Sequence, residues 1–259
     1  MKLNLQQSGD GPVLVLIHGW AMSSAIWQSM LPRLEQSFTV ICMDLPGHDG
    51  SEYADAWALD ELLESMAEQL PPKCTVLGWS LGGMLALAYT NKYPQRVSSL
   101  IMLGSSPKFV QSDDWLCGQE NDVLEAFQQG LIKDSSATIK RFVSLQTQGM
   151  ERPKETRKLL LSLLGAGPQP SKNGLTSGLR MLQNLDLRHA LKKVSCPLLM
   201  LLGEKDNLIP VGVGEQSQAI NPRIKLVVIK QAAHVLFLSH TSEVLELIEQ
   251  FLWTKERAL

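Results

Sequence analysis

Cysteine is scarce in this sequence: its 259 residues include four cysteines, Cys42, Cys74, Cys117 and Cys196, which stand far apart. A zinc or redox site built on cysteine needs close cysteine pairs or nearby histidines, and that spacing does not occur. Cys42, Cys74 and Cys196 lie in or beside apolar runs, so we predict that all three are buried as small hydrophobic side chains. The sequence therefore indicates no metal ion and no other cofactor, and a core that forms without disulfides.

Long hydrophobic runs, a leader segment and an excess of positive charge are absent as well. No apolar run is long enough to span a bilayer, and Met1-Lys2-Leu3-Asn4-Leu5-Gln6-Gln7 lacks the order of a signal peptide. The 24 Lys and Arg against 26 Asp and Glu give a net charge of -2, so no overall positive field attracts nucleic acid or an acidic membrane. We expect a soluble cytoplasmic protein that binds neither a membrane nor nucleic acid.

The sequence does contain an alternation of short apolar runs with longer amphipathic stretches. The runs are typical of strands buried on both faces of a mainly parallel sheet, and they lie at residues 13–17, 38–43, 75–78, 97–103, 197–203 and 224–229. Helical spacing of apolar residues occurs at residues 59–70, 81–92 and 242–253. This alternation predicts an α/β fold with one mainly parallel sheet flanked by helices.

The pattern changes between residues 109 and 183, where polar-rich helical segments such as residues 123–131 and 136–145 replace the apolar runs. No strand is evident from the pattern of this region. We therefore predict one core domain, formed by residues 1–108 and 184–259, with residues 109–183 inserted as an all-helical cap. A chain of this length around a single sheet is ordinary for α/β folds.

The segment Gly78-Trp79-Ser80-Leu81-Gly82 matches the pattern Gly-x-Ser-x-Gly, and it stands between a predicted strand and a predicted helix. In that context the serine lies on a sharp, strained turn that exposes its hydroxyl, and the two glycines leave room for the neighbouring backbone. The same five residues without the strand and the helix would more often be an incidental turn. The context therefore predicts Ser80 as a nucleophile.

A serine hydroxyl needs an imidazole to take its proton, and the sequence contains five histidines. His234 follows the predicted strand at residues 224–229 by a short loop, and it is the strongest candidate. The others have no such position: His48 and His189 lie in loop or helix contexts, His240 opens the last helix, and His18 belongs to a different motif.

The carboxylate that orients the imidazole is expected between the serine and the histidine in chain order, at the end of a strand. Asp206 has this position, because it follows the predicted strand at residues 197–203. Glu204 would leave that strand too early, and Asp186 precedes it altogether. The resulting order of serine, aspartate and histidine predicts a catalytic triad.

Acyl transfer also needs two N–H groups aimed at the developing oxyanion. We predict Leu81, which follows the nucleophile at a helix start, as one donor. His18-Gly19-Trp20 follows the strand predicted at residues 13–17, and we predict Trp20 as the second donor, with its ring as a wall of the pocket. Gly19 is expected to permit the backbone turn, and His18 to brace this loop by hydrogen bonds.

These motifs together resemble the α/β-hydrolase superfamily over nearly the whole chain. The matching segments are His18-Gly19-Trp20, Asp44-Leu45-Pro46-Gly47, residues 78–83, residues 203–206 and Ala232-Ala233-His234. Within the superfamily the chain is similar to the family of pimeloyl-[acyl-carrier protein] methyl ester esterases of biotin synthesis, through residues 77–83, Ser105-Ser106-Pro107, residues 141–147 and residues 184–188. It departs at Gly47-His48-Asp49-Gly50-Ser51, where relatives usually have Gly-x-Gly-x-Ser, and this loop is expected to shape the pocket entrance.

The resemblance implies an α/β-hydrolase fold and a serine carboxylic ester hydrolase that removes the methyl group from a pimeloyl-acyl-carrier-protein methyl ester. It implies substrate contacts at the triad and in the predicted cap, at Trp20, Ser80, Leu81, Phe142, Gln146 and His234.

A basic segment gives separate support for a carrier-protein partner. Residues 140–158 contain six basic side chains against Glu151 and Glu155, a net charge of +4 on a molecule of -2. Acyl carrier proteins are acidic, so such a surface would attract them. A solvated helical face without a partner is the alternative. The predicted contacts are Arg141, Arg152, Lys154, Arg157 and Lys158.

Two other functions stay open at this point. The same triad would serve a broad-specificity short-chain carboxylesterase or thioesterase that acts on small esters, or a carbon–carbon bond hydrolase. A binding protein that retains the shape of the triad without turnover is the less favoured alternative, because all the predicted triad and oxyanion residues are in place.

Overall fold

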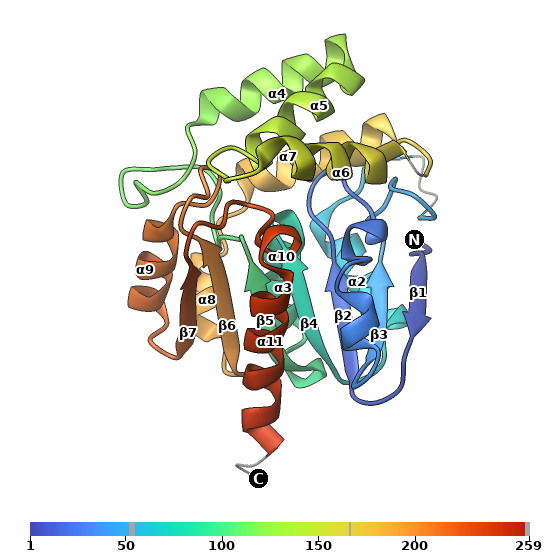
Figure 1. Ribbon diagram of the computed structural model, residues 1–259, viewed down its shortest axis with the longest axis vertical. Helices are drawn as coiled ribbons and strands as arrows, with labels where there is room; N and C mark the ends of the chain where they lie inside the picture. The colour runs from blue at the N-terminus through green and yellow to red at the C-terminus, as the bar shows by residue number, and fades with distance from the viewer. Residues whose placement is uncertain (52–54, 166, 257–259) are drawn as a thin grey trace.

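The structure is a computed structural model that describes residues 1–51, 55–165 and 167–256 (Figure 1). Its centre is a sheet of seven strands in the order β1-β3-β2-β4-β5-β6-β7. All neighbouring pairs are parallel except β1 with β3. The strands are β1 (Leu5–Ser8), β2 (Val13–Ile17), β3 (Thr39–Met43), β4 (Cys74–Trp79), β5 (Val97–Leu103), β6 (Leu198–Gly203) and β7 (Ile224–Ile229).

Six of these strands coincide with the predicted apolar runs to within one residue at either end, so the predicted α/β fold with its mainly parallel sheet is confirmed. The exception is β1, which the sequence pattern did not predict. Its residues Leu-Gln-Gln-Ser carry little apolar character, because β1 is an edge strand whose two glutamines are exposed. Strands inside a parallel sheet are covered on both faces and therefore read as continuous apolar runs.

Helices cover both faces of the sheet. In Figure 1, α11 (Thr241–Glu256) lies in front of the strands, and α3 (Leu81–Lys92) and α8 (Arg188–Lys193) lie behind them. Residues 81–90 of α3 are all buried, which fits a helix that is apolar all round and packed at the centre of the molecule. The remaining elements of this part are α1 (Leu31–Leu34), α2 (Leu59–Gln69), α9 (Val211–Ile220), α10 (Leu236–Ser239) and the 3-10 helices η1 (Ser24–Trp27) and η2 (Pro94–Arg96).

Four helices between β5 and β6 form a layer across the carboxyl ends of the strands (Figure 1). They are α4 (Asn121–Lys133), α5 (Ser135–Gln146), α6 (Pro153–Gly165) and α7 (Lys172–Asn184). Two of them begin at side-chain caps: Asp134 accepts from the Ala137 N–H and Ser171 from the Gly174 N–H. The two predicted helices at residues 123–131 and 136–145 lie inside α4 and α5.

The chain enters and leaves this helical layer at one place. Lys108 and Asp186 form an antiparallel bridge, and the Leu187 N–H donates to the Pro107 carbonyl at 2.8 Å. The ammonium of Lys108 also lies 3.3 Å from the Asp186 carboxylate. We propose residues 109–183 as a cap on a core of residues 1–108 and 184–259; its boundaries fall beside this bridge.

The burial of the cysteines differs from the prediction at one position. Cys42 and Cys74 are buried, as predicted, but Cys196 is half-buried. It directly precedes Pro197 at the amino end of β6, outside the buried part of that strand. Among the residues that the structure describes, no helix is both long and apolar enough to cross a bilayer.

Candidate active site

Ser80 lies on a sharp turn between β4 and α3, with φ 55° and ψ -120°. A non-glycine residue in this region costs on the order of 1–3 kcal/mol, and it persists only where the surroundings impose it. Two hydrogen bonds do so: the Ser80 N–H donates to the Leu103 carbonyl at 3.0 Å, and the Ser105 hydroxyl donates to the Ser80 carbonyl at 2.7 Å. β5 therefore holds the turn that presents the Ser80 side chain.

Gly78 and Gly82 have the predicted steric role. A Cβ on Gly78 would collide with the Gly82 carbonyl, and a Cβ on Gly82 would collide with the carbonyls of Ile17 and His18. The first glycine lets β4 pass the start of α3, and the second lets α3 pass the end of β2. Both collisions are with backbone atoms, which cannot move away as the end of a flexible side chain could.

The structure brings Ser80, His234 and Asp206 into one hydrogen-bonded chain. The Ser80 hydroxyl lies 3.0 Å from His234 Nε2, and His234 Nδ1 lies 2.8 Å from Asp206 Oδ2. Because an ionised carboxylate only accepts, Nδ1 carries the proton and Nε2 is left to accept the Ser80 proton. All three residues are buried.

Asp206 is fixed by its own loop. Its second carboxylate oxygen, Oδ1, accepts from the N–H groups of Leu208 and Ile209 at 2.8 and 2.9 Å. These two donors compensate the charge of a buried carboxylate, and they leave Oδ2 aimed at the imidazole.

The alternative acids and bases lie elsewhere. Asp186 pairs with Arg188 and Lys108, and Glu204 accepts from the Gln231 N–H. His189 is exposed on α8, and His240 bonds to the hydroxyl of Ser239 in the turn before α11.

The two residues predicted as oxyanion donors directly follow Ser80 and Gly19 in the chain, and Gly19 lies against Ser80. Leu81 is the first residue of α3, and Trp20 lies in the loop after β2. Among the described residues, neither N–H donates to a carbonyl outside its own element. The reason for Gly19 differs from the prediction: its φ is not left-handed, whereas that of Ala21 is 62°. Gly19 is needed for space, because a Cβ there would lie 2.9 Å from the Trp79 ring and 3.2 Å from the Ser80 Cβ.

His18 braces this loop as predicted. Its Nδ1–H donates to the Gly19 carbonyl at 2.8 Å, and its Nε2 accepts from the Leu45 N–H at 2.9 Å. The Gly19 carbonyl belongs to the same peptide group as the Trp20 N–H, so His18 fixes the plane of the predicted donor. Burial lowers the pKa of His18 to about 4, which keeps the imidazole neutral and able to accept from Leu45.

The loop at residues 44–51 joins the sheet to α7. Asp44 accepts from the Ser24 N–H at 2.6 Å and from the Asn4 side chain at 2.7 Å, and the Gly47 carbonyl accepts from the Ser171 N–H at 2.7 Å. Asp49 has φ 42°, a left-handed conformation that glycine adopts more readily than other residues. Asp49 also lines a small pocket at the side of the cap, together with Ala21, Leu163, Leu164, Gly167, Pro168 and Pro170.

The predicted substrate contacts of the cap, Phe142 and Gln146, both lie on α5, and Phe142 contacts Trp20. The rings of Phe142 and Trp20 meet edge to face, with centroids 4.8 Å apart. Gln146 is fully buried, and neither its amide oxygen nor its amide nitrogen has a hydrogen-bond partner among the described residues. A buried amide without a partner, on the same helix as Phe142, is a candidate polar contact for a ligand.

Trp79 contacts the triad in a way that the sequence reasoning missed. Its indole N–H donates to the His234 carbonyl at 3.0 Å, and its ring lies against His234 and Phe237, with centroids 5.4 and 5.3 Å apart. Trp79 occupies the first x of the Gly-x-Ser-x-Gly pattern, a position that the pattern leaves open to any residue. The available signal was its size, because a tryptophan between two required glycines has to pack against something.

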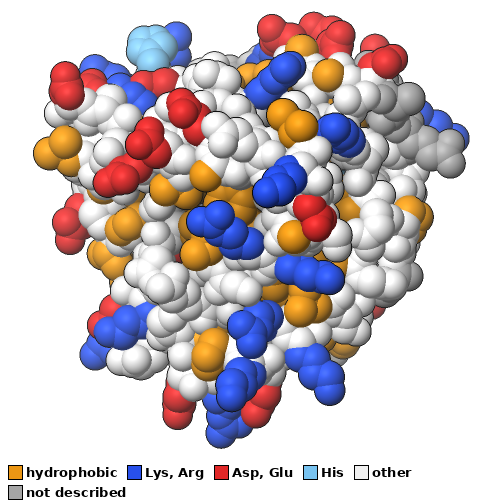
Figure 2. All heavy atoms as spheres, turned by 90° about the horizontal axis from the view of Figure 1, so that it is seen from above, with side chains coloured by type: hydrophobic (Ala, Val, Ile, Leu, Met, Phe, Trp, Pro, Cys, Tyr) orange, Lys and Arg blue, Asp and Glu red, His pale blue; other side chains and the backbone are white. Residues whose placement is uncertain are grey.

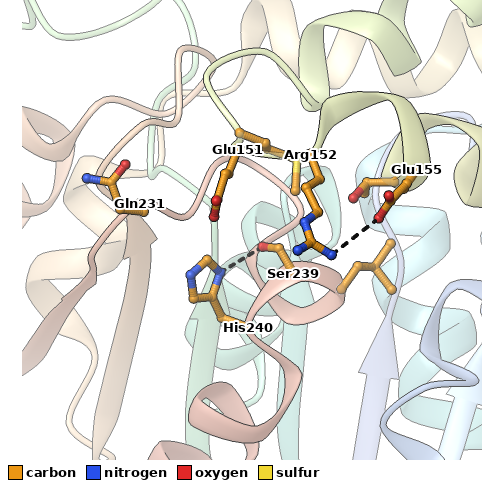
Figure 3. A pocket seen from close by; sticks show the side chains of 9 residues that line it. Glu151, Arg152, Glu155, Gln231, Ser239 and His240 are labelled. Carbon is orange, nitrogen blue, oxygen red and sulfur yellow. Dashed lines mark hydrogen bonds and ion pairs between the residues drawn. The ribbon is translucent and has the colours of Figure 1, made fainter.

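The predicted carrier-protein contacts are all exposed, but they do not all face the same way. Arg141 lies on α5, and Lys154, Arg157 and Lys158 lie on α6. Arg152 precedes α6 and lines a cleft of about 390 Å³ between the cap and the core, where it reaches Glu155 at 4.0 Å and points toward Ser239 (Figure 3). Arg152 thus lies at the mouth of this cleft, and the other four basic side chains are exposed on α5 and α6.

In the described part of the chain, no three His, Cys, Asp or Glu side chains gather as metal ligands would.

Comparison with known proteins agrees with this geometry. The model of the alpha/beta hydrolase fold family matches residues 12–241. The pimeloyl-[acyl-carrier protein] methyl ester esterase of Nitrosomonas europaea is 37% identical over 92% of this chain and 94% of its own length. That of Aeromonas hydrophila is 37% identical over 97% of this chain and 99% of its own length. Among solved structures, an esterase from Exiguobacterium antarcticum has 25% identity and a TM-score of 0.86, and covers 96% of this chain and 94% of its own.

Replacement of Trp79 by phenylalanine is expected to lower kcat for a short p-nitrophenyl ester about tenfold, with little change in KM. The ring stays, but the hydrogen bond that holds the His234 carbonyl is lost, so the imidazole is less well placed. Trp27→Phe is the matched control, because the Trp27 ring also packs on Phe237 while its indole N–H has no partner among the described residues. Equal kcat values for the two variants would contradict this role of Trp79.

Stability is expected to fall as the pH drops from 7 to 5. The buried imidazoles of His18 and His48 have pKa values lowered to about 4 and about 3, mainly by desolvation. Below pH 6.5 the unfolded chain binds protons that the folded chain does not, so each histidine removes up to about 1.4 kcal/mol of stability per pH unit. The urea midpoint, measured at both pH values, checks this.

His48→Asn should flatten this pH dependence, and His189→Asn, at an exposed position, should leave it unchanged. A wild-type midpoint that does not move between pH 7 and pH 5 would show that the two imidazoles are not held neutral.

Proposed function

The chain belongs to the alpha/beta hydrolase fold family, and within it to the family of the pimeloyl-[acyl-carrier protein] methyl ester esterases, and we propose that it hydrolyses the methyl ester of a pimeloyl-acyl-carrier protein. The products are the pimeloyl-acyl-carrier protein and methanol, a step of biotin synthesis. The observation that carries the chemistry is the distance of 3.0 Å from the Ser80 hydroxyl to His234 Nε2, with His234 held in turn by Asp206.

In the first step the Ser80 oxygen attacks the ester carbonyl while His234 Nε2 takes the hydroxyl proton. The N–H groups of Trp20 and Leu81 stabilise the negative charge that develops on the carbonyl oxygen. His234 then gives the proton to the methoxy oxygen, and methanol leaves. The Asp206 carboxylate holds the ring and stabilises the imidazolium without taking the proton.

In the second step a water molecule replaces methanol. His234 removes a proton from this water, and the resulting hydroxide attacks the acyl group on Ser80 through the same oxyanion contacts. Collapse of the intermediate returns the proton to the Ser80 oxygen and releases the free carboxylate. The acyl chain lies along the aromatic wall formed by Trp20 and Phe142, with the Gln146 amide as a polar contact.

The cap surface supports a carrier-protein partner. Figure 2 looks down on the cap and shows Lys and Arg side chains distributed over it with hydrophobic side chains between them. The exposed basic residues on α5 and α6 are Arg141, Lys154, Arg157 and Lys158. Two exposed apolar residues, Ile132 on α4 and Leu159 on α6, belong to the same cap. Such a mixed surface suits an acidic protein whose acyl arm has to reach the pocket beneath.

Ser80→Ala is expected to lower ester hydrolysis by about 10⁴-fold or more, because among the described residues Ser80 supplies the hydroxyl that is hydrogen-bonded to the His234 ring. The variant should keep the thermal unfolding midpoint of the wild type to within a few degrees. The measurements are hydrolysis of a p-nitrophenyl ester and of the carrier-bound methyl ester, and biotin-free growth of a bacterial strain that lacks the esterase. Undiminished turnover by the alanine variant would overturn the assignment of the nucleophile.

The double change Lys154→Glu and Lys158→Glu is expected to lower kcat/KM for the carrier-bound methyl ester at least tenfold and to leave that for free methyl pimelate unchanged. Reversing two charges on α6 repels an acidic partner and slows its association. Lys192→Glu with Lys193→Glu on α8 is the matched control, because it changes the net charge equally at exposed positions outside the cap.

An equal loss in the two double variants, or none in either, would favour the broad-specificity esterase that acts on small esters. Steady-state rates at low and high salt complete the test, because an electrostatic contribution falls with ionic strength.

A further inference from the structure

Helix α7 of the cap lies directly on both residues of the proposed oxyanion hole. At Gly178 the helix approaches so closely that a Cβ would lie 2.8 Å from Trp20 Cδ1 and 3.1 Å from Leu81 Cδ2. Real Cβ atoms are essentially never found within 3.0 Å of such a neighbour. Glycine at this position therefore allows one cap helix to touch the side chains of both proposed oxyanion donors.

Trp20 is also bonded to the same helix. Its indole N–H donates to the Leu175 carbonyl at 2.8 Å, in the first turn of α7. Its ring is enclosed by Phe142 and Phe127, with centroids 4.8 and 6.2 Å away. The side chain of Trp20 thus packs among the cap helices, while its backbone is part of the loop after β2.

The peptide group between Gly19 and Trp20 is consequently held from two sides. On the core side, His18 Nδ1–H donates to the Gly19 carbonyl. On the cap side, α7 holds the indole through Leu175 and Gly178. A shift of α7 that His18 does not follow rotates the Trp20 N–H away from the oxyanion position.

α7 is itself seated on the core by separate contacts. Gly174 packs on the loop at residues 44–51, where a Cβ would lie 2.8 Å from the Pro46 carbonyl. The Ser177 hydroxyl accepts from the Trp57 N–H at 3.0 Å. These contacts fix the position of α7 on the core, and the position of the Trp20 indole depends on that of α7.

We propose that α7 sets the geometry of the oxyanion hole, with Gly178 and the Leu175 carbonyl as its positioning groups. The inference rests on the proposed function, in which Trp20 and Leu81 are the oxyanion donors.

The first test is Gly178→Ala, assayed with p-nitrophenyl acetate, whose acyl group is too short to need the aromatic wall. The added methyl group displaces the Trp20 indole, and a misplacement of about 1 Å lowers kcat by roughly tenfold to a hundredfold. KM should stay within about twofold. Gly165→Ala is the matched control, because it is an exposed glycine of the neighbouring cap helix with open space around its Cβ position. It should leave both constants unchanged.

Trp20→Phe is the second test, and it keeps the inference open to refutation if Gly178→Ala does not fold. This variant retains an aromatic ring and the backbone N–H, but it loses the bond to the Leu175 carbonyl. We expect kcat to fall about tenfold with KM nearly constant. A change that affects only the packing would lower the thermal midpoint and leave kcat unchanged.

Wild-type kcat in both folded variants, together with inactive Ser80→Ala, would overturn the inference and leave the proposed function intact. Loss of kcat in all three supports both. Activity retained by Ser80→Ala would overturn the proposed function and this inference with it.

Discussion

The left-handed backbone of Ser80 is the constraint on which the rest of the site depends. With φ 55°, the residue projects its hydroxyl from the end of β4, and the chain has to turn at once into α3. Such a turn leaves no room for side chains beside it, which accounts for Gly78, Gly82 and Gly19. The strain, on the order of 1–3 kcal/mol, is offset by the bonds from β5 and Ser105 to the Ser80 peptide groups. A rigid parallel sheet is therefore a condition of the chemistry.

Two tryptophans extend this arrangement in different directions. Trp79 ties the His234 carbonyl to the residue next to the nucleophile, so that acid–base group and nucleophile move together. Trp20 ties the loop after β2 to α7 of the cap. Each uses its ring for packing and its single N–H for one directional bond. The first of these bonds lies within the core, and the second crosses to the cap, so only the oxyanion hole depends on where the cap sits.

The sequence predicted the parts of this structure that follow from local patterns. Buried parallel strands are apolar throughout, so six of the seven were found, whereas the polar edge strand β1 was not. Ser80, Asp206 and His234 were found because each follows a strand, directly or by a short loop, in a fixed chain order. The role of Trp79 was missed, and that of Gly19 was wrong in its reason, because both depend on contacts between residues far apart in the chain. The spacing of residues in a sequence does not predict which carbonyl accepts the hydrogen bond of a given indole N–H.

Charge is used differently at the site and on the cap. Around Ser80 the carboxylates of Asp206 and Asp44 are buried and each is held by short bonds from N–H donors, while His18 is kept neutral by burial. These groups act through individual hydrogen bonds, and because they are buried, solvent screens their charges little. The basic residues of α5 and α6 are exposed, so their field reaches into solvent and decays over roughly 10 Å at ordinary salt. Capture of a partner and chemistry at the ester are thus controlled by separate sets of charges. Helix α7 contacts both oxyanion residues, through Gly178 and the Leu175 carbonyl, so it is the cap element that links the position of the cap to the proposed oxyanion hole.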